Sequence, residues 1–215
     1  LGLSGGIDSS LTACIAVDAL GSDNVHGVSM PSKYSSEHSK DDAKELAQNL
    51  GIDYQVVSIE SIVNSFEYSL KASYNGTQPG VAEENIQSRA RGSIIMALSN
   101  KFNWLVLSTG NKTELAMGYC TLYGDMNGGL SVISDLSKTD VYSLSRWVNE
   151  SSGAERIPLN SIDKPPSAEL KPNQIDPFDY DVVSPLVTAL VDNQKSPSQL
   201  IKEGADPELV EDISR

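Results

Sequence analysis

The sequence predicts an α/β fold, in which a parallel sheet carries helices on both faces. Short apolar segments alternate with longer amphipathic ones along residues 1–149, as strands alternate with helices in such folds. The segment WLVLS at 104–108 is apolar throughout, which is typical of a strand covered on both faces. The turn SGGIDS at 4–9 joins an apolar segment to a helix-like one, and open α/β sheets bind ligands at turns of this kind.

The first part of the chain contains three strand signals and two helix signals. The expected elements are a strand ending at 1–3, a helix over 9–20, a strand over 24–30, a helix over 36–50 and a strand over 53–59. Gly21 and Gly51 end the two helices, because glycine accepts the left-handed conformation that follows a helix. Pro31 ends the second strand, since proline has no N–H to pair.

The middle of the chain continues the alternation. We expect a helix over 62–74, a turn over 75–80, a helix over 83–101, a strand over 104–108, a helix from about 112 and a helix over 138–149. The apolar run SIIMAL supplies the buried stripe of the long helix. Thr139 and Asp140 are typical of a helix start.

Beyond Gly153 the strand signals end and prolines recur. A chain of this composition predicts a long irregular excursion, followed by short helices at 185–191 and near 198–203. The length fits one domain, and its abrupt start within a strand leads us to expect a fragment of a longer protein.

The charge balance argues against two classes of partner. The chain has 29 acidic and 16 basic residues, a net charge of −13. Coating of nucleic acid or of an anionic membrane needs a basic surface, so we expect neither. The sequence has no long apolar span, and we expect neither a membrane span nor a signal peptide. Cys14 and Cys120 fit no metal spacing, so we expect reduced, buried thiols and a cytoplasmic protein.

The turn at 4–9 predicts a phosphate site that has no lysine of its own. Its glycines let backbone N–H groups approach an anion, and the following helix start adds partial positive charge. Asp8 would repel phosphate unless Mg²⁺ lies between them. The alternative is an ordinary helix cap built from Ser and Asp.

This turn resembles the SGGxDS pyrophosphate loop of the N-type ATP pyrophosphatases, which cleave ATP to AMP and pyrophosphate. The resemblance implies their Rossmann-like fold, of the adenine nucleotide alpha hydrolase type. Within that superfamily, four later segments are similar to the NAD synthetases. They are ENIQSRAR at 84–91, TGNKTELAMGYCTLYGD at 109–125, LSKT at 136–139 and KPPSAEL at 164–170.

Two departures indicate which branch of the family the chain resembles. Leu122 and Gly129 replace a lysine and an aspartate that are common in the shorter, ammonia-dependent enzymes. The resemblance is therefore to the synthetase domain of the glutamine-dependent type. It implies that residues 1–215 form one ATP pyrophosphatase domain, lacking an upstream glutaminase domain and the C-terminal end.

The resemblance implies a reaction and a set of site residues. ATP would adenylate the carboxylate of deamido-NAD (nicotinic acid adenine dinucleotide), and ammonia, delivered from glutamine in the longer enzymes, would displace AMP to give NAD. The implied ATP-binding residues are Gly2, Leu3, Ser4, Gly5, Gly6, Ile7, Asp8, Ser9, Met30, Thr109, Lys138 and Ser167. The implied deamido-NAD contacts are Asn85, Arg89 and Glu114. Asp8 and Glu114 would hold Mg²⁺, and with Lys138 they form the catalytic set.

Each assignment has a structural alternative. Lys138 reads equally as a surface residue at a helix start, and Glu114 as a solvated helix residue. Arg89 and Arg91 could pair with Glu83 or Glu84 along their helix, and Ser167 could make no contact. At the level of function, the alternatives are a nucleotide-binding module without turnover and another amide-forming pyrophosphatase such as GMP synthetase. The family resemblance also implies a homodimer.

Overall fold

Parallel strands form the framework of the fold, described here for residues 1–214 from a computed structural model. Strand β1 (His26–Ser29) pairs in parallel with β2 (Asp53–Val56), with His26 opposite Asp53. Gly2 forms a parallel bridge to Val28, so the residues before the first turn extend this sheet. Strand β3 (Leu107–Ser108) pairs in parallel with β4 (Leu130–Ser131). The predicted α/β class with parallel strands is confirmed.

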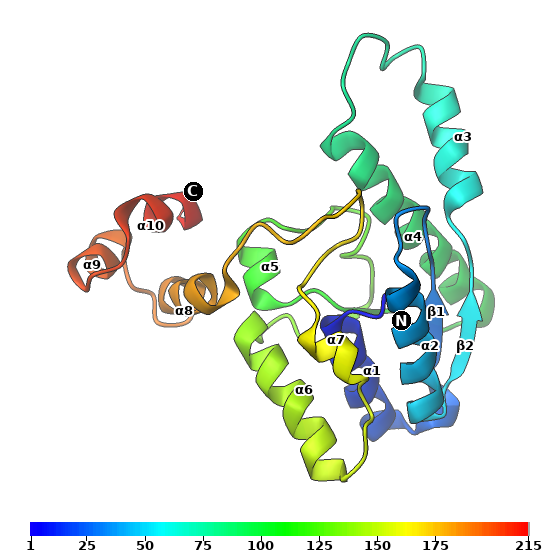
Figure 1. Ribbon diagram of the computed structural model, residues 1–215, viewed down its shortest axis with the longest axis horizontal. Coiled ribbons are helices and arrows are strands. Elements are labelled where there is room, and N and C mark those ends of the chain that lie inside the picture. The colour runs from blue at the N-terminus through cyan, green and yellow to red at the C-terminus, as the bar shows by residue number, and fades with distance from the viewer. Residues whose placement is uncertain (215) are drawn as a thin grey trace.

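Helices pack against the strands in two apolar clusters. The larger cluster joins the first residues of the chain to helices α1 (Ile7–Leu20), α2 (Glu37–Leu50), α6 (Lys138–Ser152) and α7 (Leu159–Asp163). The smaller joins α3 (Glu60–Leu70) to the long helix α4 (Val81–Phe102). Figure 1 shows α3 and α4 side by side, apart from α1 and α6.

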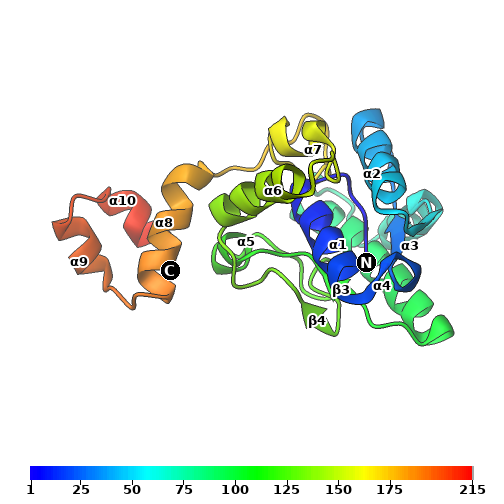
Figure 2. The same ribbon diagram turned by 90° about the horizontal axis from the view of Figure 1, so that it is seen from below.

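The last helices form an arm that extends from this body. Helix α8 (Tyr180–Val191) contacts α5 (Lys112–Ala116) and α6. Helix α9 (Pro197–Lys202) packs on α8, and α10 (Pro207–Ile213) packs on α9. Figures 1 and 2 both show α9 and α10 far to one side of the strands. The segment between α7 and α8, residues 164–179, runs along the body and then leaves it to begin this arm.

Several predicted elements differ from the observed ones. The strand expected at 104–108 is reduced to Leu107–Ser108, and Leu105 is 66% exposed, so the covering on both faces is incomplete. Strand β4 was not predicted, because two residues carry no periodic pattern. Pro185 lies inside α8 and does not begin it, since Asp179 caps the helix six residues earlier. Helix α10 was also missed, and a short 3-10 helix spans Ser22–Asn24.

Among residues 1–214, no helix is long and apolar enough to cross a membrane.

Candidate functional site

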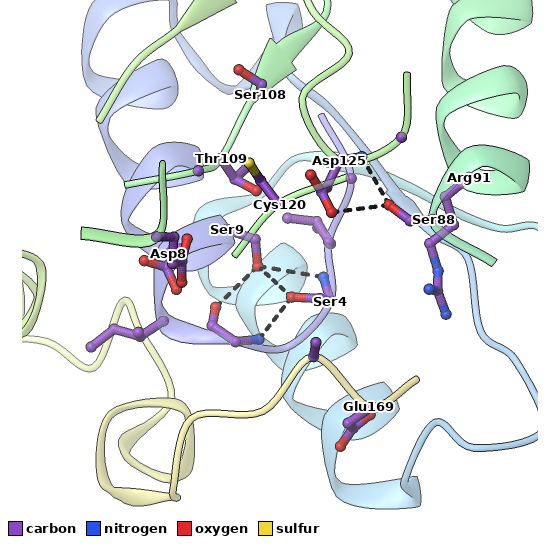
Figure 3. A pocket seen from close by; sticks show the side chains of 18 of the residues that line it. Ser4, Asp8, Ser9, Ser88, Arg91, Ser108, Thr109, Cys120, Asp125 and Glu169 are labelled. Carbon is purple, nitrogen blue, oxygen red and sulfur yellow. Dashed lines mark hydrogen bonds between the residues drawn. The ribbon is translucent and has the colours of Figure 1, made fainter. Parts of the chain in front are cut away.

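A large pocket opens where the parallel strands end. Its volume is about 640 Å³. Most of its wall comes from five segments that are far apart in the sequence, and helices α2, α4, α5 and α6 add further side chains; Figure 3 shows the side chains of 18 of the lining residues. The segments are 2–9, 28–31, 107–110, 124–131 and 164–170. This is the position at which open α/β sheets bind ligands.

The turn at 4–9 enters the pocket as the start of α1, and its own hydroxyl groups hold its shape. Ser9 Oγ lies 3.1 Å from Ser4 Oγ and donates to the Gly6 carbonyl oxygen at 3.0 Å, while the Gly6 N–H donates to Ser4 Oγ at 3.1 Å (Figure 3). Gly6 is the N-cap residue, and no side chain caps it. The reading of this turn as a Ser or Asp cap is therefore wrong, and the N–H groups of the first turn lack a capping partner.

Gly5 explains why this turn needs a glycine. Its φ is +78°, and a Cβ there would lie 2.1 Å from the carbonyl oxygen of Ser39 in α2. Neither the conformation nor the space admits a larger residue. Gly5 is also the one predicted ATP residue that does not line the pocket, since it packs against α2 instead.

Three helix starts bring an ion cluster into the pocket. Asp8 lies in the first turn of α1, Glu114 in the first turn of α5, and Lys138 is the first residue of α6. The Lys138 ammonium lies 2.5 Å from Asp8 Oδ2 and 2.9 Å from Glu114 Oε1. Lys138 is only 2% exposed, so its reading as a surface residue is wrong.

Electrostatics keep the lysine of this cluster charged. Burial alone would lower the pKa of the Lys138 ammonium, but the carboxylates of Asp8 and Glu114 outweigh burial and raise the pKa above its ordinary value. Burial and the charge of Asp8 raise the pKa of Glu114 to about 7, although Lys138 opposes this rise. The ring of Tyr180 lies 5.2 Å from the same ammonium, which adds a cation–π contact. Lys138 thus remains a cation throughout the neutral range.

The two carboxylates fit the requirements of Mg²⁺. Asn111 Nδ2 donates to Asp8 Oδ1 at 2.8 Å, so each Asp8 oxygen has one protein donor. A carboxylate offers about four lone-pair sites, so acceptor capacity remains on the pocket side. No group of three or more His, Cys, Asp or Glu side chains suited to a metal occurs within residues 1–214. A pair of carboxylates is nevertheless sufficient where substrate phosphates supply the remaining oxygens, as is usual for Mg²⁺.

The other predicted ATP residues also line the pocket. They are Gly2, Leu3, Ser4, Gly6, Ile7, Ser9, Met30, Thr109 and Ser167. Ser167 is exposed, and its hydroxyl oxygen accepts a hydrogen bond from the N–H of Glu169 at 3.1 Å. The structure therefore brings these residues together with Asp8, Glu114 and Lys138.

Two of the predicted deamido-NAD contacts lie outside the pocket. Asn85 Oδ1 accepts a hydrogen bond from Thr121 Oγ1 at 2.8 Å. Arg89 is exposed, and its Nε donates to the carbonyl oxygen of Leu122 at 3.2 Å. These residues share one face of α4 and tie it to the segment at 121–122. Glu114 alone of the three lines the pocket.

Sequence reasoning missed three residues of the site. Asn111 is fully buried and caps α5 together with Glu114, a pattern (N-x-x-E) that a search for capping boxes would have found. Glu169, which lines the pocket, accepts hydrogen bonds from Ser36 and Ser39 at the start of α2. Arg91 lines the pocket. Arg91 and Glu169 lie in the segments at 84–91 and 164–170 that resemble the family, but neither was given a role there.

The cysteines differ from one another. Cys14 is buried and free, as predicted, whereas Cys120 is free but only half-buried, and it lines the pocket. The expectation of two buried thiols is therefore wrong for Cys120, because the segment after α5 forms part of the pocket wall.

Comparison with known proteins places the chain in a family. The sequence profile described as NAD synthase matches residues 1–215. The chain belongs to the NAD synthase family. Glutamine-dependent NAD(+) synthetases of Synechocystis sp. and Thermotoga maritima are 52% and 48% identical to it, over 98% and 100% of this chain. The chain spans about 38% of the length of these two relatives.

Solved structures of the same family share the fold. The glutamine-dependent NAD+ synthetase of Acinetobacter baumannii, in complex with ADP, superposes with a TM-score of 0.75 and 44% identity, covering 100% of this chain and 39% of that one. The NMN synthetase of Francisella tularensis gives a TM-score of 0.81 and 27% identity, covering 99% and 80%. The resemblance to the synthetase part of the glutamine-dependent NAD synthetases is confirmed.

Proposed function

We propose that this chain binds ATP and Mg²⁺ and catalyses the ATP-dependent amidation of deamido-NAD to NAD. One observation carries the proposal: three helix starts bring Asp8, Glu114 and Lys138 into one pocket beside the uncapped N-terminus of α1. Backbone N–H groups, a buried cation and a carboxylate pair are the groups that a nucleoside triphosphate with its metal requires. Membership of the NAD synthase family supports the choice of acceptor.

The reaction has two steps. A carboxylate oxygen of deamido-NAD attacks the α-phosphorus of ATP, and the bond to the β-phosphate oxygen breaks to release pyrophosphate. Ammonia then attacks the activated carbonyl carbon, AMP leaves with the bonding electron pair, and the nitrogen loses a proton to give the amide of NAD. The first step moves negative charge onto pyrophosphate, so preorganised positive groups lower its barrier.

The residues of this chain have distinct roles in these steps. The first-turn N–H groups of α1 and the hydroxyl of Ser4 would hold the leaving pyrophosphate. Lys138 would supply a point charge to the phosphates. Asp8 and Glu114 would hold Mg²⁺, which when bound supplies positive charge to phosphate oxygens.

The remaining partners follow from the same family. Relatives named glutamine-dependent are much longer than this chain, which supports delivery of ammonia by a glutaminase domain in the whole protein. Asn85 and Arg89 lie outside the pocket on an accessible face of α4, which supports a deamido-NAD site that extends beyond it, and we propose a homodimer around that site.

The test is direct assay of the chain with deamido-NAD, ATP, Mg²⁺ and ammonium, measuring NAD, AMP and pyrophosphate. Asp8→Asn should abolish Mg²⁺-dependent pyrophosphate release while the fold is retained. Asp23→Asn is the matched control, because Asp23 is exposed and distant from the pocket-lining set. Retained turnover in Asp8→Asn would refute the metal role.

Other outcomes identify the alternatives. ATP binding without NAD formation would indicate a nucleotide-binding module. Consumption of xanthylate would indicate a GMP synthetase-like enzyme. Similarity to an NMN synthetase makes nicotinic acid mononucleotide the second substrate to assay. Amidation of the mononucleotide in preference to deamido-NAD would replace the proposed substrate.

A further inference from the structure

Arg91 is a charged residue of the pocket wall to which the reaction above gives no role. It projects from the middle of α4, and its Nε donates to the carbonyl oxygen of Met30 at 2.9 Å. Met30 follows strand β1, so this bond joins the long helix to a strand end 61 residues away. Figure 3 shows Arg91 and Asp8 on opposite sides of the pocket, with Ser4 and Ser9 between them.

The guanidinium of Arg91 has unused hydrogen-bonding capacity. Burial lowers its pKa to about 10, while Glu169 and Asp125 oppose the change, so it remains charged at neutral pH. Within residues 1–214, it forms no ion pair, and the Met30 carbonyl is its one hydrogen-bond partner. A guanidinium has five N–H donors, so four remain available. A charge taken out of water without a partner is costly, which favours a ligand that completes the set.

We propose that Arg91 determines the base specificity of the nucleotide site by holding the purine end of ATP. The proposal rests on the proposed function. Asp8 marks the phosphate end of the pocket, and Arg91 lies at the other end, next to the turn at Met30. The Nε bond fixes the Met30 carbonyl oxygen, which has a second lone pair. That lone pair accepts the 6-amino group of adenine but repels the 6-oxo group of hypoxanthine, while the free N–H groups of Arg91 donate to ring nitrogens.

The experiment compares ATP with ITP, which differs in carrying a 6-oxo group in place of the 6-amino group. Affinities are measured by calorimetry on the unaltered chain and on Arg91→Met. The unaltered chain should bind ATP at least about tenfold more tightly than ITP, the ratio that one hydrogen bond to a charged or fixed group supports. In Arg91→Met, ATP affinity should fall by about tenfold or more, and the ATP/ITP ratio should approach one.

The control variants distinguish recognition of the base by Arg91 from an effect of its positive charge alone. Lys101→Met removes one positive charge from an exposed position on the same helix and should leave both affinities unchanged. Arg91→Lys keeps the charge but lacks the planar fork, and it should also lose discrimination. An equal loss of ATP and ITP affinity in Arg91→Met would mean that Arg91 acts by charge on the phosphates, and would overturn the proposal.

A measurement on the unaltered chain covers the case in which both variants fail to fold. Addition of ATP should shift the arginine side-chain NMR signals of Arg91 and slow the exchange of its N–H protons. Unchanged signals would overturn the proposal, as would equal affinity of the unaltered chain for ATP and ITP. If the unaltered chain bound neither nucleotide, the proposed function itself would fail, which is a different result.

Discussion

At the scale of single residues, Lys138 has two roles that oppose each other. Its ammonium neutralises Asp8 and Glu114, whose side chains are 18% and 17% exposed. It is also the cation that the proposed reaction requires at the phosphates. Because Lys138 already pairs with Asp8 and Glu114, it can contact a phosphate only if the ligand or its metal ion binds one of these two carboxylates instead.

Removal of this lysine should destabilise the fold. Lys138→Met leaves two partly buried carboxylates facing each other, and we expect a loss of about 3 kcal/mol in the free energy of unfolding, measured by urea denaturation. Lys112→Met is the control, because Lys112 pairs with Asp192 at 2.6 Å where the carboxylate is 41% exposed, and the loss there should stay below about 1 kcal/mol. Equal losses in the two variants would contradict this account.

The two cysteines should differ in reactivity. Burial raises the pKa of the Cys14 thiol to about 11, and burial with the Asp125 charge also raises that of Cys120. A raised pKa lowers the thiolate fraction, so iodoacetamide should label Cys120 slowly at pH 8 and faster as the pH rises. Cys14 should react only after unfolding. Mass spectrometry should show protection of Cys120 by ATP, and labelling that ATP does not slow would contradict its place in the nucleotide pocket.

The sequence predicts some site residues and not others for a physical reason. Asp8, Glu114 and Lys138 lie in motifs that resemble those of the NAD synthetases, and the structure places each of them at a helix start. Arg91 and Glu169 reach the pocket through tertiary packing, from the middle of a helix and from an irregular segment. No periodicity marks residues of that second kind.

At the scale of elements, the segment at 164–176 lines the pocket and is joined to α2 by Glu169 and Lys164. Glu169 accepts from Ser36 N at 3.2 Å, from Ser36 Oγ at 2.8 Å and from Ser39 Oγ at 2.8 Å. Ser36 is the N-cap of α2, so the carboxylate also meets the positive end of that helix. Lys164 adds a bond to Asp42 of α2 at 2.8 Å.

Loss of this carboxylate should open the segment without unfolding the body. In Glu169→Ala, proteinase K should cut 164–176 faster, and the stability of the whole chain should fall by about 1–2 kcal/mol. Glu45→Ala is the matched control, since Glu45 is exposed on α2. Unchanged cleavage of the segment in Glu169→Ala would show that other contacts hold it.

Helix α4 meets the segment at 123–127 through a glycine. A Cβ on Gly92 would lie 2.5 Å from Asn127 Nδ2 and 2.8 Å from the Gly124 carbonyl oxygen. Gly92→Ala should therefore cost about 1–3 kcal/mol in thermal or urea unfolding. Gly80→Ala, where a Cβ meets nothing within 4 Å, should change stability by less than about 1 kcal/mol. Equal effects at the two positions would argue against close packing here.

Long elements were predicted more accurately than short ones. Helices α1, α2 and α4 lie within a few residues of their expected bounds, because glycine, proline and apolar spacing act locally. Strands β3 and β4 have two residues each, and their pairing depends on the whole sheet. The start of α8 was also misplaced. The helix begins after its cap residue Asp179, so Pro185 lies inside it.

At the scale of the molecule, the arm of α8–α10 has buried apolar residues that belong to neither apolar cluster of the body. Val187 of α8, Leu200 of α9 and Val210 of α10 are all buried, and the main apolar cluster contains none of them. Thr113 Oγ1 lies 3.1 Å from Ser184 Oγ of α8, which ties this helix to the body. The outer two helices depend on α8 for their packing.

The arm should therefore unfold separately from the body. In Leu200→Ala, amide hydrogen exchange should speed up in α9 and α10 while α1 keeps its protection. The cavity left by the substitution lies in the arm, so the loss of about 2–5 kcal/mol in stability should be confined to the arm. Leu11→Ala is the comparison, since Leu11 is 1% exposed in the main cluster and its loss should speed exchange throughout the body. Faster exchange of α1 amides in Leu200→Ala would show that the arm and the body unfold together.

The origin of the pocket walls has a consequence for synthesis. The pocket wall begins at residues 2–9 and its late part comes from 164–170 and Asp176, and the carboxylate of Glu169 joins that late part to α2. A chain growing on a ribosome makes α1 early, yet it cannot close the nucleotide pocket until Glu169 has left the exit tunnel. The proposed binding of ATP at this pocket should therefore follow translation of nearly the whole body, and a nascent chain that stalls earlier should gain no stabilisation from ATP.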